Sequence, residues 1–183
     1  MMWVLLIVAA IIIIAVVVIY NSLVRLRVQA DNAWADIDVQ LKRRYDLIPN
    51  LVETVKGYAA HEKGTLEAVI DARARAINAQ GAGPAARAEA EAGLAGALKS
   101  LFALSESYPQ LQAAGNFRAL QDSLGTIEEA VQNARRYYNA VVRDYNTRIH
   151  TVPSNVVAGA FGFQPREFFE IAAAEREAPR VSF

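Results

Sequence analysis

An uninterrupted apolar run near the start of the chain constrains its fold more than any other feature. Residues 3–20 read WVLLIVAAIIIIAVVVIY and include no charged side chain. As an α-helix this run rises ~27 Å, close to the thickness of the hydrocarbon core of a bilayer. A cleaved secretory signal would instead have a basic start, a shorter apolar core and a small-residue cleavage site. We therefore expect a single transmembrane helix in an anchor of residues 1–24, which contacts the lipid bilayer through residues 3–20.

The charges beside this run predict its orientation. Only Met1 and Met2 precede the run, whereas Arg25 and Arg27 follow it closely. Basic residues that flank a transmembrane helix tend to stay in the cytoplasm. We therefore expect a single-pass protein of the cell (inner) membrane with its N-terminus outside and the bulk of the chain in the cytoplasm.

The composition of the remaining chain narrows the class of protein. The remaining residues, about 160 of them, have the size of one domain that can bury its own core. No cysteine is present, which excludes disulfides, thiolate metal sites and a cysteine nucleophile. The formal net charge is zero, so the chain offers no overall attraction for nucleic acid. We expect no nucleic-acid partner.

Apolar or small side chains recur every three or four residues after the anchor, which is typical of one face of an amphipathic helix. Pro49 interrupts this first series, and the pattern leaves open whether the helix continues through Pro49 or folds back there. The series comprises Leu23, Leu26, Ala30, Ala33, Ile37, Leu41, Ile48, Leu51, Val55, Tyr58, Leu66, Val69, Ala72 and Ala76.

Two further helices follow a glycine- and proline-containing loop at residues 78–84. One is expected from about residue 84 to residue 107, with Leu94, Leu98 and Leu101 on one face, and the next from Asn116 as its N-cap. The last helix carries a heptad pattern at Leu120, Leu124, Ile127, Val131, Ala134, Tyr138, Val141, Tyr145 and Ile149, with Val152 at its end. We expect an all-α fold, an antiparallel bundle of about four long helices with coiled-coil-like packing over residues 25–171, and a flexible tail at 172–183.

Motifs for catalysis are not recognisable in the sequence. His61 and Glu62 match the first half of the zinc motif H-E-x-x-H, but Thr65 stands where the second histidine is needed. Neither a G-x-S-x-G nucleophile elbow nor a glycine-rich phosphate-binding loop occurs. We expect no catalytic, cofactor-binding or metal site, no cofactor and no enzymatic activity.

Two polar patterns allow a structural and a more specific interpretation. Residues 36–46 carry acids and bases at helical spacing, either as a solvated face with pairs such as Lys42 and Asp46, or as a polar seam that fixes helix packing. Tyr-Asn occurs at residues 138–139 and again seven residues later at 145–146. The repeat is interpreted as a device that specifies packing register, with a ligand-binding ladder as the alternative.

Several aromatic residues also have two interpretations. Trp34 lies ~20 Å beyond Tyr20 along a straight helix, so it is expected in the core or at the edge of the bundle. Four phenylalanines near the end of the chain are expected to pack in the core or at the end of the bundle, with contact to a membrane or a partner as the alternative. They are Phe161, Phe163, Phe168 and Phe169.

Three stretches of the sequence closely resemble the LemA family. They are AWADIDVQLKRRYDLIPNLVETVKGYAAHE at residues 33–62, SESYPQLQAAGNFRALQ at residues 105–121 and ARRYYNAVVRDYNTRIHTVPSNVVAGAFGF at residues 134–163. The resemblance implies a single-pass bacterial membrane protein with a bundle of about four long helices and no established enzymatic activity. It also implies relatives from magnetosome membranes and genes that often lie near those of a membrane metalloprotease. It provides no catalytic or ligand residues to transfer to this chain.

These observations favour a membrane-anchored, non-catalytic helical scaffold or adaptor. We expect it to assemble with itself as a homo-oligomer or to organise other membrane proteins. One alternative is a regulator or partner of a membrane metalloprotease, and a third is an enzyme with an unrecognised site.

Overall fold

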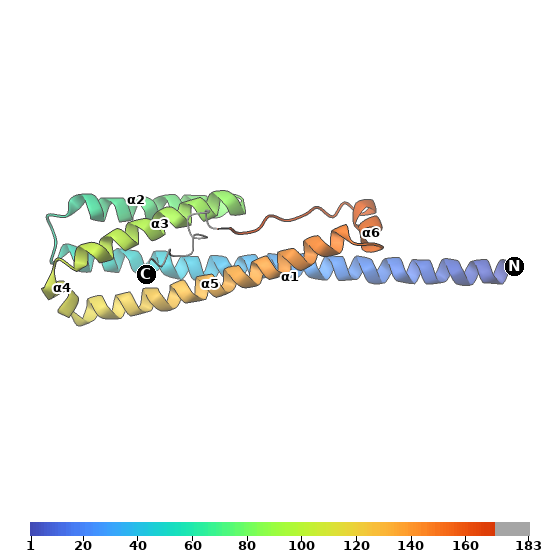
Figure 1. Cartoon of the computed structure of the whole chain (residues 1–183), viewed down its shortest axis with the longest axis horizontal. Coiled ribbons are helices and arrows are strands. Elements are labelled where there is room, and N and C mark those ends of the chain that lie inside the picture. Colours follow the sequence, from blue (N-terminus) through green and yellow to red (C-terminus); the bar gives the residue numbers. More distant parts are fainter. Residues whose placement is uncertain (171–183) are drawn as a thin grey trace, which may run out of the picture.

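The computed structural model describes residues 1–170, which are mostly helical and contain no strand (Figure 1). The all-α prediction is therefore confirmed, while the expected tail at 172–183 lies outside the described residues. The helices are α1 (Met2–Lys56), α2 (Lys63–Asn78), the 3₁₀ turn η1 (Ala79–Gly81), α3 (Pro84–Ser105), α4 (Pro109–Ala113), α5 (Gly115–His150) and α6 (Ser154–Ala160).

Helix α1 runs through Pro49 without a break and is 55 residues long, ~82 Å at the usual rise. Proline deprives the carbonyl oxygen four residues earlier, that of Tyr45, of its helical donor. Arg73 of α2 replaces that donor, with Nε 2.8 Å from the Tyr45 oxygen. Of the two alternatives left open at Pro49, continuation is correct, and the chain folds back only afterwards, at residues 57–62.

The bundle consists of two antiparallel helix pairs. α1 packs most extensively against α5, and α2 against α3, with further contacts between α1 and α2 (Figure 1). The apolar faces expected from the sequence supply most of the core, including Ile37, Leu41, Val69, Leu94 and Leu101, each fully buried. Among the residues expected on these faces, Tyr58 and Val152 are exposed because they follow the last turns of α1 and α5.

The connection between α3 and α5 contains a short helix that the sequence did not predict. Pro109 begins the short helix α4, which buries Leu111 completely. Helix α5 then begins at Gly115 with Ala114 as its N-cap, so the expectation that Asn116 caps it is wrong. The Asn116 side chain instead accepts a hydrogen bond from the neighbouring backbone N–H of Phe117.

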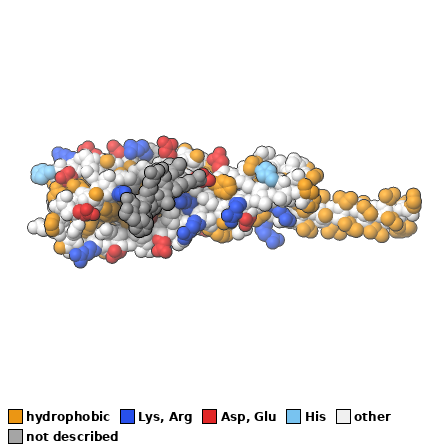
Figure 2. Space-filling model, in the orientation of Figure 1, with side chains coloured by type: hydrophobic (Ala, Val, Ile, Leu, Met, Phe, Trp, Pro, Cys, Tyr) orange, Lys and Arg blue, Asp and Glu red, His pale blue; other side chains and the backbone are white. Residues whose placement is uncertain are grey.

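At the opposite end of the bundle, α6 packs on both α1 and α5 (Figure 1). A small core forms there around Leu23, Ile149 and Val157, with Val16 and Ile19 partly buried against it. The side chains of residues 1–15 are all exposed, and they form the apolar rod that projects from the bundle in Figure 2. Within the described residues, α1 is the one helix long and apolar enough to cross a membrane, and its most apolar window is entirely unburied.

Candidate functional site

A buried polar network joins three helices inside the bundle. Arg44 of α1 is 4% exposed, and its guanidinium lies 3.2 Å from the Glu91 carboxylate of α3 and 3.3 Å from Glu128 of α5. Tyr45 donates its hydroxyl hydrogen to the same Glu91 carboxylate. Since each of these groups is satisfied by residues from another helix, the network fixes how α1, α3 and α5 pack together.

A second buried arginine, Arg87, lies on α3 one turn before Glu91. Arg87 is fully buried, pairs with Asp38 of α1 and places its guanidinium 5.1 Å from the centre of the Trp34 ring. Asp38 thus contacts another helix, as the polar-seam interpretation requires. Lys42 and Asp46 form the surface pair of the other interpretation, with 2.7 Å between charged atoms.

Arg87 and Glu91 were not predicted as buried polar residues, although their positions in the sequence carry a signal. They precede Leu94, Leu98 and Leu101 at alternating steps of four and three, so both charged residues lie on the apolar face of α3. Charged residues on such a face are expected to be paired when buried.

Burial raises the pKa of Glu91 above its ordinary value of 4.5, because the desolvation of the carboxylate outweighs the effect of Tyr45 and Arg44. Burial and the neighbouring carboxylate of Glu91 also raise the pKa of Tyr45. For Glu91 a raised pKa in the folded state means that folding favours the protonated carboxyl. Its contribution to stability is therefore present below pH 4.5 and is lost as the pH rises through the raised value.

This sign gives a prediction for Glu91→Gln, whose side chain does not titrate. The unfolding free energy of the natural protein, minus that of Glu91→Gln, should fall as the pH rises above 4.5. Urea unfolding of both proteins across this range, followed by circular dichroism, measures the difference. Glu89→Gln on the exposed side of α3 is the matched control and should show no such trend. A difference that rises with pH would contradict the assigned direction.

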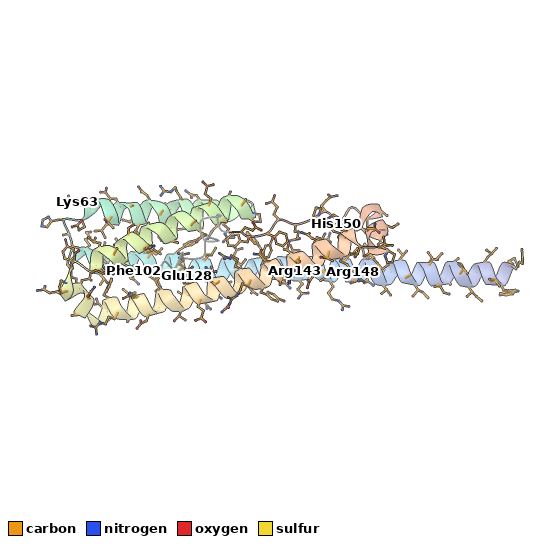
Figure 3. All side chains as sticks on the ribbon, viewed as in Figure 1. Lys63, Phe102, Glu128, Arg143, Arg148 and His150 are labelled. Carbon is orange, nitrogen blue, oxygen red and sulfur yellow. The ribbon has the colours of Figure 1, made fainter. Side chains whose placement is uncertain are left out.

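A groove of about 410 Å³ lies beside this network, between α3 and α5 (Figure 3). Its surface is largely apolar, and Arg44 and Glu128 connect it to the buried network. The shape and lining suit an apolar group more than a reacting substrate, because the lining offers neither a histidine nor a hydroxyl nucleophile. The lining residues are Arg44, Ala95, Leu98, Lys99, Phe102, Gln121, Leu124, Gly125 and Glu128.

The repeated Tyr-Asn pairs of α5 bind an extended segment of the chain itself. We call Tyr138, Asn139, Tyr145 and Asn146 the Tyr–Asn ladder. Each asparagine makes two hydrogen bonds to one backbone position, Asn146 to Arg166 (2.8 and 2.9 Å) and Asn139 to Phe169 (3.1 and 2.9 Å).

The two tyrosines of the ladder add one hydrogen bond each. Tyr145 donates to the carbonyl of Gln164 at 3.0 Å, and Tyr138 to that of Glu167 at 2.9 Å. Burial raises the pKa of both hydroxyls, so both remain donors at neutral pH. Because the ladder holds the chain's own backbone, it acts structurally and places Phe169 against Trp34, with 5.5 Å between ring centres.

The ladder predicts which change releases this segment. Asn146→Ala removes both hydrogen bonds to Arg166, and the backbone groups left behind are part-buried. We expect a loss of about 1–3 kcal/mol in local stability and faster tryptic cleavage after Arg166 in the natively folded protein. Asn133→Ala, on the exposed face of α5, is the control and should leave the cleavage rate unchanged. Equal cleavage of the two variants would contradict the role of the ladder.

The remaining candidates are not brought together. His61 and His150 are both exposed, and no group of three His, Cys, Asp or Glu side chains that could hold a metal ion occurs among residues 1–170. Phe163 and Phe169 are buried, as the packing interpretation expects, whereas Phe161 is 56% and Phe168 38% exposed.

Comparison with known proteins gives one family and several relatives. The model of the LemA family matches residues 33–183. The chain is 26% identical over 175 residues to the magnetosome protein MamQ 2 of Paramagnetospirillum magneticum. The matched region covers 82% of this chain and 64% of that protein. The chain is also 25% identical over 158 residues to the protein LemA of Metamycoplasma hominis. Here the matched region covers 85% of this chain and 71% of that protein. The chain therefore spans less than two thirds of the length of this MamQ protein, and the family match begins inside α1.

Proposed function

The chain belongs to the LemA family, and on that premise we propose that it is a membrane-anchored, non-catalytic helical scaffold that assembles with itself or organises membrane partners. The observation that carries this proposal is the continuity of α1 from the exposed apolar rod to the far end of the bundle. A bundle attached to its anchor by one unbroken helix has no hinge at the membrane surface. Its position relative to the bilayer is then fixed, as a scaffold requires.

The proposed orientation places the bundle in the cytoplasm. Arg25 and Arg27 follow the apolar run of residues 3–20 closely, and the fold brings Arg143 and Arg148 of α5 to the same end of the bundle (Figure 3). A cluster of basic side chains on one side of the membrane is typical of the cytoplasmic side.

A cysteine tests this orientation, since the natural chain has none. Gln80→Cys lies at an exposed position in η1 and should be protected from a membrane-impermeant thiol reagent in intact cells. Labelling should appear after the membrane is permeabilised, which controls for access to the thiol. Equal labelling of intact and permeabilised cells would reverse the orientation.

Self-association is proposed to use the apolar rod. Its side chains have no partner within the bundle, and anchors confined to one plane raise the local concentration of identical subunits. The membrane-proximal half of α1 does not leave its apolar stripe uncovered as a second interface. Leu23, Ala33 and Ile37 are at most 1% exposed there.

Light scattering of the full-length protein in mild detergent tests self-association, and a monomer at all concentrations would contradict it. Gly125→Leu fills the groove between α3 and α5, whereas Gly93→Leu makes the same change at an open helical position outside it. If the rod forms the interface, neither variant changes the particle mass. Loss of assembly in Gly125→Leu alone would move the interface to the groove. Stoichiometric co-purification with a membrane protease would instead support the alternative function, a regulator of a membrane metalloprotease.

A further inference from the structure

Helix α6 and the residues that flank it (151–164), here called the α6 corner, pack beside the end of the apolar run in α1. Val16 and Ile19 pack against the small core that includes Val157, and the Tyr20 ring lies 4.9 Å from Phe161. Val16 is the first residue of α1 that packs on the bundle, and the 15 residues before it account for ~22 Å of helix. The hydrocarbon core of a bilayer is about 30 Å thick. If the apolar run fills that core, α6 is drawn down to the boundary between acyl chains and headgroups.

The composition of this corner suits such a position. Residues 151–164 contain no charged side chain. Three of their apolar side chains point away from the bundle, Val152 (80% exposed), Val156 (70%) and Phe161 (56%). Exposed apolar side chains beside a membrane anchor gain free energy by entering the interface, and aromatic rings such as Phe161 and Tyr20 are favoured there.

A basic cleft lies immediately beyond the corner, between α1 and α5. It has a volume of about 480 Å³, and three arginines and one aspartate are among its lining residues (Figure 3). Ser22 and Arg25 lie only two and five residues after Tyr20, so the cleft lies within ~8 Å of the end of the apolar run. The lining residues are Ser22, Arg25, Leu26, Arg143, Asp144, Thr147, Arg148 and Thr151.

The charges of the cleft leave it with an excess of donors for an anion. Asp144 is 3.9 Å from Arg143 Nε, a loose contact between two exposed side chains, and it neutralises at most one of the three arginines. Arginine guanidinium groups bind phosphate oxygens in a forked geometry, and the hydroxyls of Ser22 and Thr147 can donate as well.

We infer that α6 lies in the headgroup boundary of the bilayer and that the cleft between α1 and α5 binds the phosphate of an anionic membrane lipid, such as a phosphatidylglycerol. The apolar corner sets the depth of the protein, and the cleft then lies at the level of the headgroups, where anionic lipids are concentrated. The inference rests on the proposed anchoring but adds a specific lipid site to it.

Native mass spectrometry of the full-length protein in mild detergent tests the site, with phosphatidylglycerol and phosphatidylcholine added separately. We expect preferential retention of phosphatidylglycerol. Each of the single variants Arg25→Gln, Arg143→Gln and Arg148→Gln should reduce that retention on the order of fivefold, and the triple variant that combines them should reduce it most. Lys63→Gln, at the far end of the bundle in Figure 3, should have no effect. Equal retention of the two lipids, or undiminished retention by the triple variant, would overturn the inference. Displacement of the lipid by inorganic phosphate would assign the cleft to free phosphate and overturn it too.

The depth of α6 is tested separately in vesicles. Val156→Cys with an environment-sensitive fluorophore should be quenched by lipids that carry a quencher on the acyl chain, while the same label on Gln80→Cys should not. No quenching at residue 156 would overturn the placement of α6. Vesicle flotation of the unlabelled protein reports on anchoring alone, so failure of the anchor is distinguishable from failure of the lipid site.

Discussion

Replacement of Arg44 by methionine should destabilise the bundle by about 3–5 kcal/mol, because it leaves the buried Glu91 carboxylate without its cationic partner. Tyr45 would remain as a donor to that carboxylate, but a neutral hydroxyl cannot replace the charge. The Glu128 carboxylate contributes less to the cost, since it is 43% exposed and water can solvate it. Urea unfolding of the detergent-solubilised protein, followed by circular dichroism, measures the loss.

Two variants separate this explanation from a simple loss of packing. Lys42 lies two residues before Arg44 on α1 and forms an exposed ion pair with Asp46. Lys42→Met breaks that pair and should cost only about 0.3–0.5 kcal/mol. The double variant Arg44→Met/Glu91→Leu removes both buried charges and should recover much of the stability lost in Arg44→Met. A double variant less stable than Arg44→Met would show that the cost does not come from an unpaired carboxylate.

Helical periodicity was sufficient to predict the buried faces of the long helices, but not the turn at residues 57–62 that separates α1 from α2. The positions that recur every three or four residues in α1, α2, α3 and α5 are mostly the buried positions, because a long helix with one apolar stripe can bury it only against another helix. The short helix α4 was not predicted. The single turn and a half of α4 is too short to show a period, and burial of Leu111 decides its position.

Pro49 illustrates an interaction that the local sequence cannot reveal. Its effect on the backbone is predictable, but whether the helix breaks depends on a donor from elsewhere in the chain. Arg73 supplies that donor to Tyr45 from 28 residues away. The turn forms instead at residues 57–62, where no such compensation is needed.

The polar interactions were predictable only in part. The Tyr-Asn repeat was recognised as structural, yet its target, the backbone of residues 164–169, lacks a sequence signature because backbone atoms accept and donate whatever the side chain. Only the α1 side of the buried network was predictable. Asp38 and Arg44 belong to the charged stretch at residues 36–46 that the sequence analysis singled out, whereas their partners Arg87 and Glu91 in α3 were not predicted.

The heptad of α5 gives the second large effect. Val131 is 5% exposed and belongs to the main core, so Val131→Asp should place a carboxylate among apolar side chains without a partner. We expect a loss of roughly 3–5 kcal/mol, a large fraction of the stability of a single domain. Thermal unfolding followed by circular dichroism should show a melting temperature lowered by several degrees or more.

Asn133→Asp is the matched control, because it introduces the same carboxylate two residues further along α5 on the exposed face. Residue 133 accepts a hydrogen bond from Arg136 in the natural protein, and aspartate preserves that acceptor. The control should therefore melt close to the natural protein. Because α5 covers most of the length of α1 above the membrane, unfolding of Val131→Asp should also expose the apolar stripe of α1 that the bundle now buries. Equal melting temperatures for the two variants would mean that the heptad face does not carry the core.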